Sequence, residues 1–348
     1  MRLPIEPPYL PMEASETERL PFGAQWVYEP KWDGFRCLAF RDRTEIALQS
    51  KAGQPLTRYF PEIVEQLRRL QVARFVLDGE VMVEVHGRLS YDALAQRIHP
   101  ARSRAHALAR ESPARYVVFD LLVDEDIGDC TALALDERRM RLERFMRRHA
   151  SASPLLLSPQ SRSRAEAMEW FARTRDALDG IVAKRADLPY ASGTRAAAVK
   201  LKRMRTADCV VGGYRLNAER NGIGALLLGL YDAAGRLHYV GYTSGFKTRE
   251  RSPLLKRLRE IEGGPGFEGV RPGDVRYLGE PLVEEAWFPV APRLIVEVHY
   301  HHLAGDRFRD GAKLVRWRPD KSPRQCTFEQ FASAVAGSPL DMFSTFSS

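Results

Sequence analysis

Residues 29–36, "EPKWDGFR", place Lys31 two residues before an Asp-Gly pair and Arg36 two residues after it. Asp-Gly is a strong signal for a tight hairpin turn, because both central residues of such a turn favour positive φ. The segments that follow, residues 37–42 and 45–50, alternate apolar and polar residues as strands do. Taken alone, the stretch is as consistent with a surface hairpin that carries solvated charges as with a functional site.

The composition indicates a chain of two ordinary domains. It has 348 residues, of which 44% are apolar, enough for two separate cores. Lys and Arg outnumber Asp and Glu by 53 to 45, and the pI of about 9.4 is compatible with a polyanionic partner. Many soluble proteins share this balance, so charge alone identifies no ligand.

Cysteine spacing and hydropathy exclude several classes of protein. The four cysteines are scattered without a CxxC pair, which argues against a zinc module and a disulfide framework and fits a reducing cytoplasm. The first 20 residues are interrupted by prolines and acids, and no run of about 18 apolar residues occurs. We therefore expect a protein that is neither secreted nor membrane-spanning.

The pattern of the chain changes near residue 205. The first part mixes helical and strand patterns, whereas the second is rich in strands interrupted by Gly and Pro, with one helix near residues 252–261. Expected helices in the first part cover residues 58–70, 135–149 and 164–178, and expected buried strands cover residues 74–83 and 115–123. This predicts an α+β domain over residues 1–205 and an all-β domain over 206–348. The second domain is expected to hold a small closed barrel of the OB type over about residues 207–325.

Asp-Gly recurs twice in charged surroundings. Asp78-Gly79 is followed by Glu80 and is expected to end a strand, whereas Asp179-Gly180 is expected to open one. Each pair alone is most simply a turn. Lys200 and Lys202, however, are two residues apart and share one face of an expected strand.

Together these segments suggest strand ends that line one cleft. The cleft would join the carboxylates of Asp33, Glu80 and Asp179 with the amines of Lys31, Lys200 and Lys202. Lysines bind phosphate oxygens, and carboxylates share Mg²⁺ with substrate phosphates. The mixture suits a nucleoside triphosphate with a divalent metal.

These residues carry a resemblance to a known family. The segment from Lys31 to Arg36 resembles motif I, KxDGxR, of ATP-dependent DNA ligases. Six further segments resemble the family's motifs Ia, III, IIIa, IV, V and VI in order: residues 50–51, 77–80, 118–120, 179–184, 199–202 and 316–321. The length is similar to that of the stand-alone bacterial ligase C type, which is related to the ligase module of bacterial ligase D. The resemblance implies an adenylyltransferase (nucleotidyltransferase, ATP-grasp-like) domain followed by an OB-fold domain.

The resemblance also implies roles in nucleotide chemistry. Lys31 would attack the α-phosphorus of ATP and form lysyl-AMP, assisted by Asp33, Lys200 and Lys202. The positive charges of these lysines and of bound metal are expected to favour the neutral amine of Lys31. Residues expected to bind the nucleotide are Glu29, Lys31, Arg36, Glu80, Phe119, Lys184, Lys200, Lys202 and Arg316. Among them, Glu80 would bond the ribose and Phe119 would stack on adenine.

Other implied roles concern metal, DNA and the leaving group. Asp179, where glutamate is commoner in the family, would bind Mg²⁺ or Mn²⁺ together with Glu80. Lys51 lies where many relatives have arginine and would grip the 5′-phosphate of the nick, and Arg36 would contact the ribose or the nick. The residues of motif VI would move in with the barrel domain and orient pyrophosphate: Arg316, Arg318 and Lys321.

We therefore expect an ATP-dependent DNA ligase that seals nicks in duplex DNA and acts in repair. A monomer in the bacterial cytoplasm, associated with the nucleoid and with end-binding or repair proteins, fits this function. No separate DNA-encircling domain is expected before residue 30. The alternatives are an RNA ligase, a GTP-using capping enzyme, and a catalytically silent nucleic-acid-binding OB-fold protein.

Overall fold

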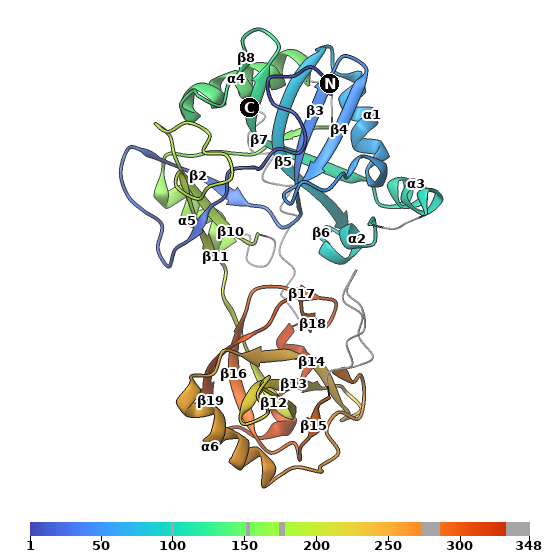
Figure 1. The fold of residues 1–348 in the computed structure, drawn as a ribbon, viewed down its shortest axis with the longest axis vertical. Coiled ribbons are helices and arrows are strands. Elements are labelled where there is room, and N and C mark those ends of the chain that lie inside the picture. The colour runs from blue at the N-terminus through green and yellow to red at the C-terminus, as the bar shows by residue number, and fades with distance from the viewer. Residues whose placement is uncertain (99–100, 151–153, 174–177, 273–285, 332–348) are drawn as a thin grey trace. The chain divides into compact units, whose positions relative to one another are not determined.

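The computed structural model describes residues 1–98, 101–150, 154–173, 178–272 and 286–331. The chain divides into two compact units, one containing Met1–Arg203 and the other beginning at Met204 (Figure 1). The expected boundary after residue 205 lies at the start of strand β12 (Arg205–Leu216). The assignment of residues 332–348 to the second domain falls outside the described residues.

A seven-stranded sheet forms the centre of the first unit. Its main path runs β4-β3-β5-β7-β8, with β6 paired to β5 and β9 paired to β7. The strands are β3 (Phe35–Asp42), β4 (Glu45–Ser50), β5 (Arg74–Val85), β6 (Arg88–Leu89), β7 (Ala114–Asp124), β8 (Gly128–Asp129) and β9 (Leu156–Leu157). The helical elements of this part are η1 (Thr57–Tyr59), α1 (Pro61–Arg69), α2 (Tyr91–Ala95), α3 (Arg102–Glu111) and α4 (Leu135–His149).

Helices α1 and α4 cover one face of this sheet. Leu67 of α1 and Leu142 and Phe145 of α4 share a buried cluster with Phe75 and Leu77 of β5. The apolar residues of α4 recur at three- and four-residue spacing, so one stripe of the helix faces the sheet. The opposite face of the sheet packs against a second sheet.

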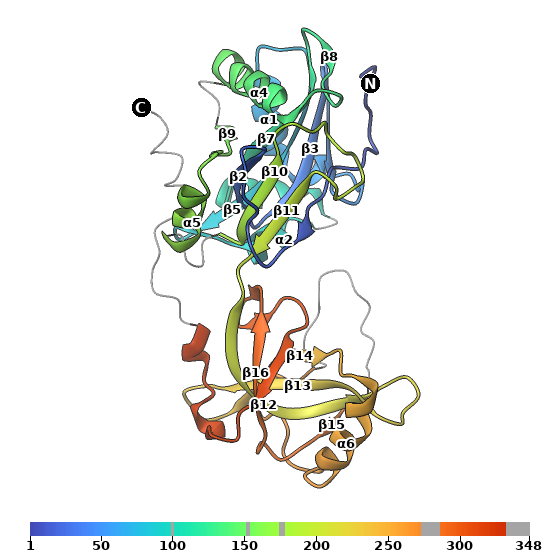
Figure 2. The same cartoon turned by 90° about the vertical axis from the view of Figure 1, so that its left-hand side faces the viewer.

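That second layer is a four-stranded sheet with the order β1-β11-β10-β2 (Figure 2). Its strands are β1 (Ser15–Glu16), β2 (Trp26–Lys31), β10 (Gly180–Arg185) and β11 (Ala198–Lys202). Trp170 of helix α5 (Arg164–Arg173) packs with Ile181 of this sheet in a buried cluster. The same cluster contains Trp32 and also Met82, which lies on β5 of the larger sheet. The two sheets therefore face each other across the interior of the first unit.

The hairpin expected at Asp33-Gly34 is wrong. β2 pairs with β10 and β3 pairs with β4 and β5, so the Asp-Gly pair connects one sheet to the other. Gly34 does not adopt positive φ, and a Cβ added there would lie 2.2 Å from the carbonyl oxygen of Val81. Close approach of β5, rather than turn geometry, requires this glycine.

The strand end expected at Asp78-Gly79 is also wrong, because this pair lies in the middle of β5. A Cβ at Gly79 would lie 2.3 Å from the carbonyl oxygen of Val117 on β7. Asp179-Gly180 does open strand β10, as expected. The recurrent Asp-Gly pairs thus mark tightly packed strands more than turns.

In its described residues, the second unit is a closed β-barrel with one α-helix. Its sheet runs β14-β13-β12-β16-β19, and a parallel bridge between Thr243 on β14 and Ala312 before β19 joins the two ends. Besides β12, its strands are β13 (Ile223–Tyr231), β14 (Leu237–Ser244), β15 (Phe288–Pro289), β16 (Ile295–Tyr300), β17 (Leu303–Ala304), β18 (Arg307–Phe308) and β19 (Lys313–Trp317). Its helical elements are α6 (Thr248–Arg259), η4 (Pro323–Gln325) and η5 (Phe328–Phe331). The expected all-β barrel is confirmed.

Several other expectations concern single helices, strands and cysteines. The helix expected over residues 135–149 coincides with α4, and the expected buried strands coincide with β5 and β7 to within two residues. The helix expected over residues 164–178 ends at Arg173 in α5, and residues 174–177 lie outside the described residues. All four cysteines are buried thiols without disulfides. Across the described residues, no helix combines the length and apolar character needed to span a membrane.

Candidate active site

A pocket with a volume of about 200 Å³ lies between the two sheets of the first unit. Both sheets and the segment of residues 11–14 contribute to its walls. Eight of the predicted site residues line it: Glu29, Lys31, Arg36, Lys51, Glu80, Phe119, Lys184 and Lys200. The pocket therefore assembles residues from motifs I, Ia, III, IIIa, IV and V.

Lys31 is the last residue of β2, and its Nζ forms an ion pair with Asp179. The backbone holds this pair in place, because the amide of Asp179 donates to the carbonyl oxygen of Lys31 at 3.1 Å. Gly180 lets β10 approach β11 closely, since a Cβ there would lie 2.0 Å from the carbonyl oxygen of Leu201. Strand pairing thus brings the Asp179 carboxylate, whose side chain is only 2% exposed, to the lysine.

Burial lowers the pKa of Lys31 from its ordinary value of 10.5 to about 8. The carboxylates of Glu80 and Asp33 oppose this shift, and the charges of Lys200 and Lys202 add to it. The expected effect of Lys200 and Lys202 is therefore present, and burial, which the sequence interpretation did not include, is the largest cause of the shift. With this pKa about a tenth of the side chain is neutral at pH 7, several hundred times more than for an ordinary lysine.

Glu80 lies beside Lys31 on the wall formed by the larger sheet. It pairs in register with Arg36 across β5 and β3. Burial raises the pKa of Glu80 to about 7, against the opposing charges of Arg36 and Lys31. A carboxyl group in this environment exchanges its proton near neutral pH.

The carboxylates around Lys31 could supply part of the coordination shell of a divalent metal, and substrate phosphates would supply the rest. No cluster of three or more metal-binding side chains occurs among the described residues. Mg²⁺, however, commonly takes only one or two carboxylates, together with phosphate oxygens and water. Asp179 is in direct contact with Lys31, and Glu80 and Asp33 are close enough to influence its pKa. This oxygen donor set is suited to Mg²⁺ or Mn²⁺.

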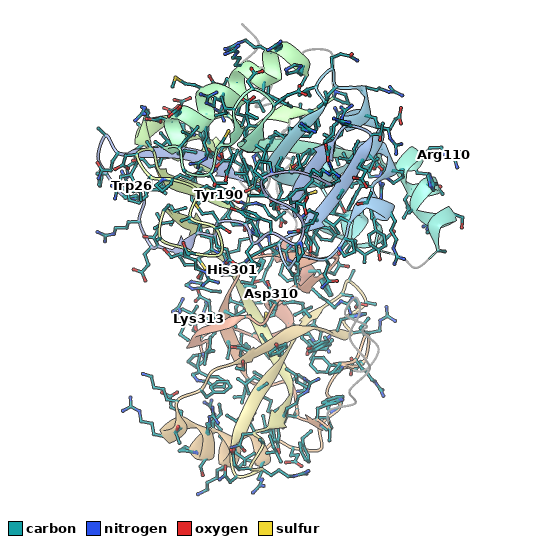
Figure 3. All side chains as sticks on the ribbon, turned by 45° about the horizontal axis from the view of Figure 1, so that its top comes forward. Trp26, Arg110, Tyr190, His301, Asp310 and Lys313 are labelled. Carbon is teal, nitrogen blue, oxygen red and sulfur yellow. The ribbon has the colours of Figure 1, made fainter. Side chains whose placement is uncertain are left out.

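Arg36 is fixed by a carboxylate that the sequence interpretation did not assign. Its Nε and Nη2 donate to Asp78 Oδ1 and Oδ2, each at 2.6 Å. Asp78 is fully buried, and the hydroxyl of Tyr190, labelled in Figure 3, donates to its Oδ2 at 2.6 Å. Asp78 and Glu80 are two residues apart and share a face of β5, a signal that was present in the sequence. Tyr190 carried no such signal.

The ring of Phe119 lies between the arginine and lysine side chains of the pocket. Arg36 Cζ and Lys184 Nζ are each 4.5 Å from the ring centroid, within range of cation–π attraction. Lys184 Nζ also donates to Glu29 Oε2 at 2.6 Å, and Gln160 Nε2 donates to Glu29 Oε1 at 3.0 Å. Buried ion pairs thus hold the aromatic wall, and Gln160 is a further residue that the sequence interpretation missed.

Lys200 and Lys202 share one face of β11, as expected. Both approach Glu16 Oε1, at 4.0 and 2.6 Å respectively. Burial and the charge of Lys202 lower the pKa of Lys200. Lys51 lies 3.0 Å from Glu13 Oε2, so two acids of the N-terminal segment pair with the outer lysines. Neither glutamate was singled out from the sequence.

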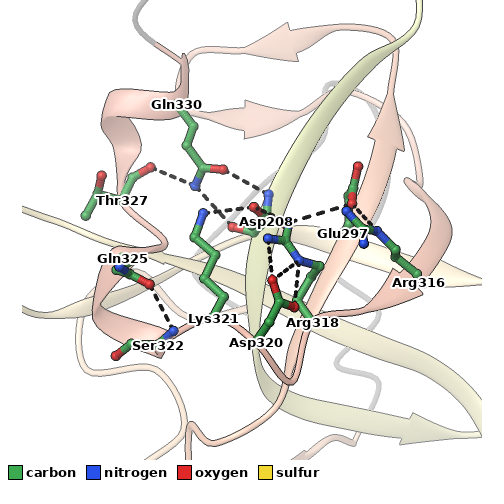
Figure 4. A network of polar contacts seen from close by, with 10 residues as sticks. All are labelled: Asp208, Glu297, Arg316, Arg318, Asp320, Lys321, Ser322, Gln325, Thr327 and Gln330. Atoms are coloured by element: carbon green, nitrogen blue, oxygen red, sulfur yellow. Dashed lines mark hydrogen bonds and ion pairs between the residues drawn. The ribbon is translucent and has the colours of Figure 1, made fainter.

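The basic residues of motif VI lie in the second unit and do not line the pocket described above. Arg316 Nε donates to Glu297 Oε2 at 2.7 Å, and Arg318 and Lys321 both bind Asp208 (Figure 4). All three predicted residues therefore belong to one polar cluster on the barrel. Lys202, Asp33 and Asp179 lie next to the pocket of the first unit without lining it.

Two family models match most of this chain. A family described as "ATP dependent DNA ligase domain" matches residues 11–202, and one described as "ATP dependent DNA ligase C terminal region" matches residues 219–321. This chain belongs to the ATP-dependent DNA ligases. The family identified from the sequence motifs is confirmed, and with it an enzyme that uses ATP and a divalent metal.

Individual relatives agree with this assignment. The ligase is 41% identical to DNA ligase C1 of Mycolicibacterium smegmatis, with 95% of each chain covered. It is 38% identical to DNA ligase C of Mycobacterium tuberculosis, covering 98% of this chain and 99% of the relative. A solved Lig E DNA ligase matches with a TM-score of 0.57 at 15% identity, over 89% of this chain and 99% of that one, and supports the fold.

Proposed function

We propose that this ligase seals nicks that carry a 5′-phosphate and a 3′-hydroxyl, with Lys31 as the nucleophile. The observation that carries the proposal is a partly buried amine, with its pKa lowered to about 8, among the carboxylates and lysines of one pocket. In the first step the Lys31 amine attacks the α-phosphorus of ATP. A P–N bond forms, the bond to pyrophosphate breaks, and the amine loses its proton.

The remaining steps transfer and then release AMP. The nick 5′-phosphate attacks the α-phosphorus of lysyl-AMP, the P–N bond breaks, and the Lys31 nitrogen takes up a proton and leaves as the amine. The 3′-hydroxyl then attacks the activated 5′-phosphate, and AMP leaves with the bonding electrons. Each displacement depends on positioning and charge neutralisation, which a preorganised pocket of fixed charges supplies.

The pocket residues have distinct tasks in this proposal. Phe119 stacks on adenine beside Glu29 and Lys184, Glu80 bonds the ribose, and Arg36 contacts the ribose or the nick. Lys200 and Lys202 stabilise negative charge on the α-phosphate, and Lys51 binds the 5′-phosphate of the nick. In this structure each of these three lysines pairs with a glutamate. Their side chains are 22% to 55% exposed, so solvent and phosphate reach them.

Asp179 and Glu80 would hold Mg²⁺ or Mn²⁺, with Asp33 nearby. When bound, the cation supplies positive charge to the phosphate oxygens. The present ion pair with Asp179 favours the ammonium form of Lys31. A divalent cation held by Asp179 would compete with Lys31 for this carboxylate and would thereby favour the neutral amine. The motif VI residues Arg316, Arg318 and Lys321 orient the pyrophosphate.

We further propose a role in DNA repair, as a monomer in the cytoplasm near the nucleoid, with end-binding or repair proteins as partners. One observation supports the repair role. Over 92% of its length the chain is 28% identical to a protein named multifunctional non-homologous end joining protein LigD, of Mycolicibacterium smegmatis. The match covers 40% of that relative.

The test is covalent labelling with α-labelled ATP. The wild type is expected to form an acid-labile adduct, and Lys31→Ala to form none and to lose sealing with ATP. Lys31→Arg retains the charge and most of the volume, and should fail equally, because a guanidinium is not nucleophilic. Labelling by GTP instead of ATP would favour a capping enzyme, and sealing of nicked RNA alone would favour an RNA ligase. An undiminished adduct in Lys31→Ala would exclude Lys31.

A further inference from the structure

Asp208, in strand β12, is the centre of the motif VI cluster (Figure 4). Both of its oxygens accept from Arg318 Nη1, at 2.7 and 2.9 Å, and its Oδ2 also accepts from Lys321 Nζ at 2.8 Å. Its backbone is fixed from the other side, because Gln330 accepts from its amide at 2.9 Å and donates to its carbonyl at 3.1 Å. One carboxylate thus holds both cations that the proposed function assigns to pyrophosphate.

Arg318 is also bound along its other edge. Its Nε and Nη2 donate to Asp320, at 3.0 and 2.9 Å, and its Nη1 lies 3.7 Å from Glu297. The hydrogen bonds from Arg318 lower the pKa of Asp320 to about 2. The donors of the guanidinium therefore point at carboxylates of the same unit.

The cluster as a whole carries no net formal charge. Three cations face three carboxylates: Arg316, Arg318 and Lys321 against Asp208, Glu297 and Asp320. A neutral cluster exerts little long-range attraction on a triphosphate. For Arg318 and Lys321 to bind phosphate oxygens, an internal carboxylate has to give them up.

We propose that Asp208 is a positioning residue that holds Arg318 and Lys321 and exchanges them for the pyrophosphate portion of ATP during self-adenylation. The inference rests on the proposed function of motif VI. Carboxylate and phosphate oxygens both accept charge-assisted hydrogen bonds from guanidinium and ammonium donors, so a phosphate oxygen replaces Asp208 on Arg318 Nη1 and Lys321 Nζ without rebuilding the cluster. Asp208 thereby sets the concentration of ATP or pyrophosphate at which the two cations change partners.

The test is Asp208→Asn, which keeps the volume and the backbone bonds to Gln330 but removes the charge. In self-adenylation with labelled ATP, the KM for ATP should fall about threefold to tenfold, because a charge-assisted hydrogen bond no longer competes. The reverse reaction gives a second readout: a pyrophosphate oxygen attacks the α-phosphorus of lysyl-AMP, the P–N bond breaks, ATP forms and the Lys31 amine takes up a proton. The concentration of inorganic pyrophosphate for half-maximal reversal should fall by a similar factor.

Two controls separate this role from a structural one. Asp232→Asn removes a carboxylate of the same unit that pairs with Arg236 and His238, and it should leave the KM for ATP unchanged. Closure of a nick that already carries AMP involves no pyrophosphate, so Asp208→Asn should leave its rate unchanged.

A KM that rises or does not change in a folded Asp208→Asn protein would overturn the inference. If Asp208→Asn does not fold, Asp320→Asn provides the test of the KM for ATP. The Asp320 side chain is 60% exposed, and loss of its charge frees the other edge of Arg318. A fall in the KM of that variant supports the inference, and an unchanged or higher KM rejects it. Absence of any adduct in the wild type would reject the proposed nucleophile instead, so the two failures are distinguishable.

Discussion

The lysine pocket of the first unit and the motif VI cluster of the second both combine cations with carboxylates, but they bury them to different degrees. In the pocket and directly beside it, Glu29, Asp78 and Asp179 are each no more than 3% exposed, and each holds a cation from another segment of the first unit. In the cluster, the side chains of Arg316 and Asp320 are about three-fifths exposed, and those of Asp208, Arg318 and Lys321 are 14%, 18% and 21% exposed. Similar residue types therefore sit in two different dielectric environments.

Burial decides what each set of charges is able to do. In the pocket it shifts the pKa of Lys31 and of Glu80 toward neutrality and locks the geometry around the nucleophile. Breaking a buried pair leaves a charge without water, so such pairs are not easily exchanged. Ion pairs near the surface are weak and solvent replaces either partner, which suits groups that must change partners during the reaction. The Glu29–Lys184 and Asp78–Arg36 pairs therefore hold their charges in place, whereas the less deeply buried Asp208 pairs of the cluster are better able to exchange them.

The largest expected effect separates the two regions by reaction step. Arg318→Ala combined with Lys321→Ala should slow self-adenylation about 100-fold or more, because the leaving pyrophosphate loses charge stabilisation. The same double variant should close a pre-adenylated nick at an appreciable rate, and its melting temperature should change little. Equal losses in both reactions would show that motif VI serves DNA binding or folding, and the contrast between the regions would fail.

A second prediction tests the buried side of the comparison. Asp78→Ala removes the partner of both Arg36 and Tyr190 and should lower the free energy of unfolding by about 3 kcal/mol, because it leaves a guanidinium buried without a counter-charge. Glu65→Ala, which removes the partner of Arg69 on an exposed helix face, should lower it far less. Denaturant unfolding of both variants measures the difference. Equal destabilisation would mean that burial does not distinguish these pairs.

A third prediction follows from the lowered pKa of Lys31. Only the neutral amine attacks, so kcat/KM for self-adenylation, which reports the free enzyme, should rise about tenfold per pH unit below pH 8 and level off above it. An ordinary lysine would keep the rate rising past pH 10. Closure of a pre-adenylated nick does not use the Lys31 amine and should lack this dependence. A rise that continues to pH 10 would show that the pocket does not lower the pKa.

Local patterns predicted much of this arrangement. The period of two in strands placed Lys200 and Lys202 on one face, and the apolar spacing of residues 135–149 defined α4, because both depend only on near neighbours in the chain. The motifs then supplied eight of the residues that line the pocket.

Local sequence patterns did not predict the contacts between residues that lie far apart in the chain. The error at Asp33-Gly34 arose because β2 takes its partner β10 from about 150 residues away, and turn propensity carries no information on such pairing. The Tyr190–Asp78 bond spans 112 residues, and the Gln160–Glu29 bond spans 131. The burial that lowers the pKa of Lys31 likewise results from the packing of two sheets, which is why only the contribution of neighbouring charge was predicted from the sequence.

The smallest expected effect concerns Lys51. It lines the pocket, but its side chain is 55% exposed and paired with Glu13, so its solvent exposure is similar to that of the outer residues of the motif VI cluster. If it binds the nick 5′-phosphate, DNA affinity should fall with salt, each neutralised phosphate adding about 0.9 to the slope of log affinity against log salt. Lys51→Ala should reduce that slope by about one such increment and leave self-adenylation nearly unchanged. Titration of potassium chloride against nick binding and adduct formation, in wild type and variant, measures both quantities. An unchanged slope would remove Lys51 from the DNA contact, whereas a parallel loss of self-adenylation would place it among the buried charges of the pocket.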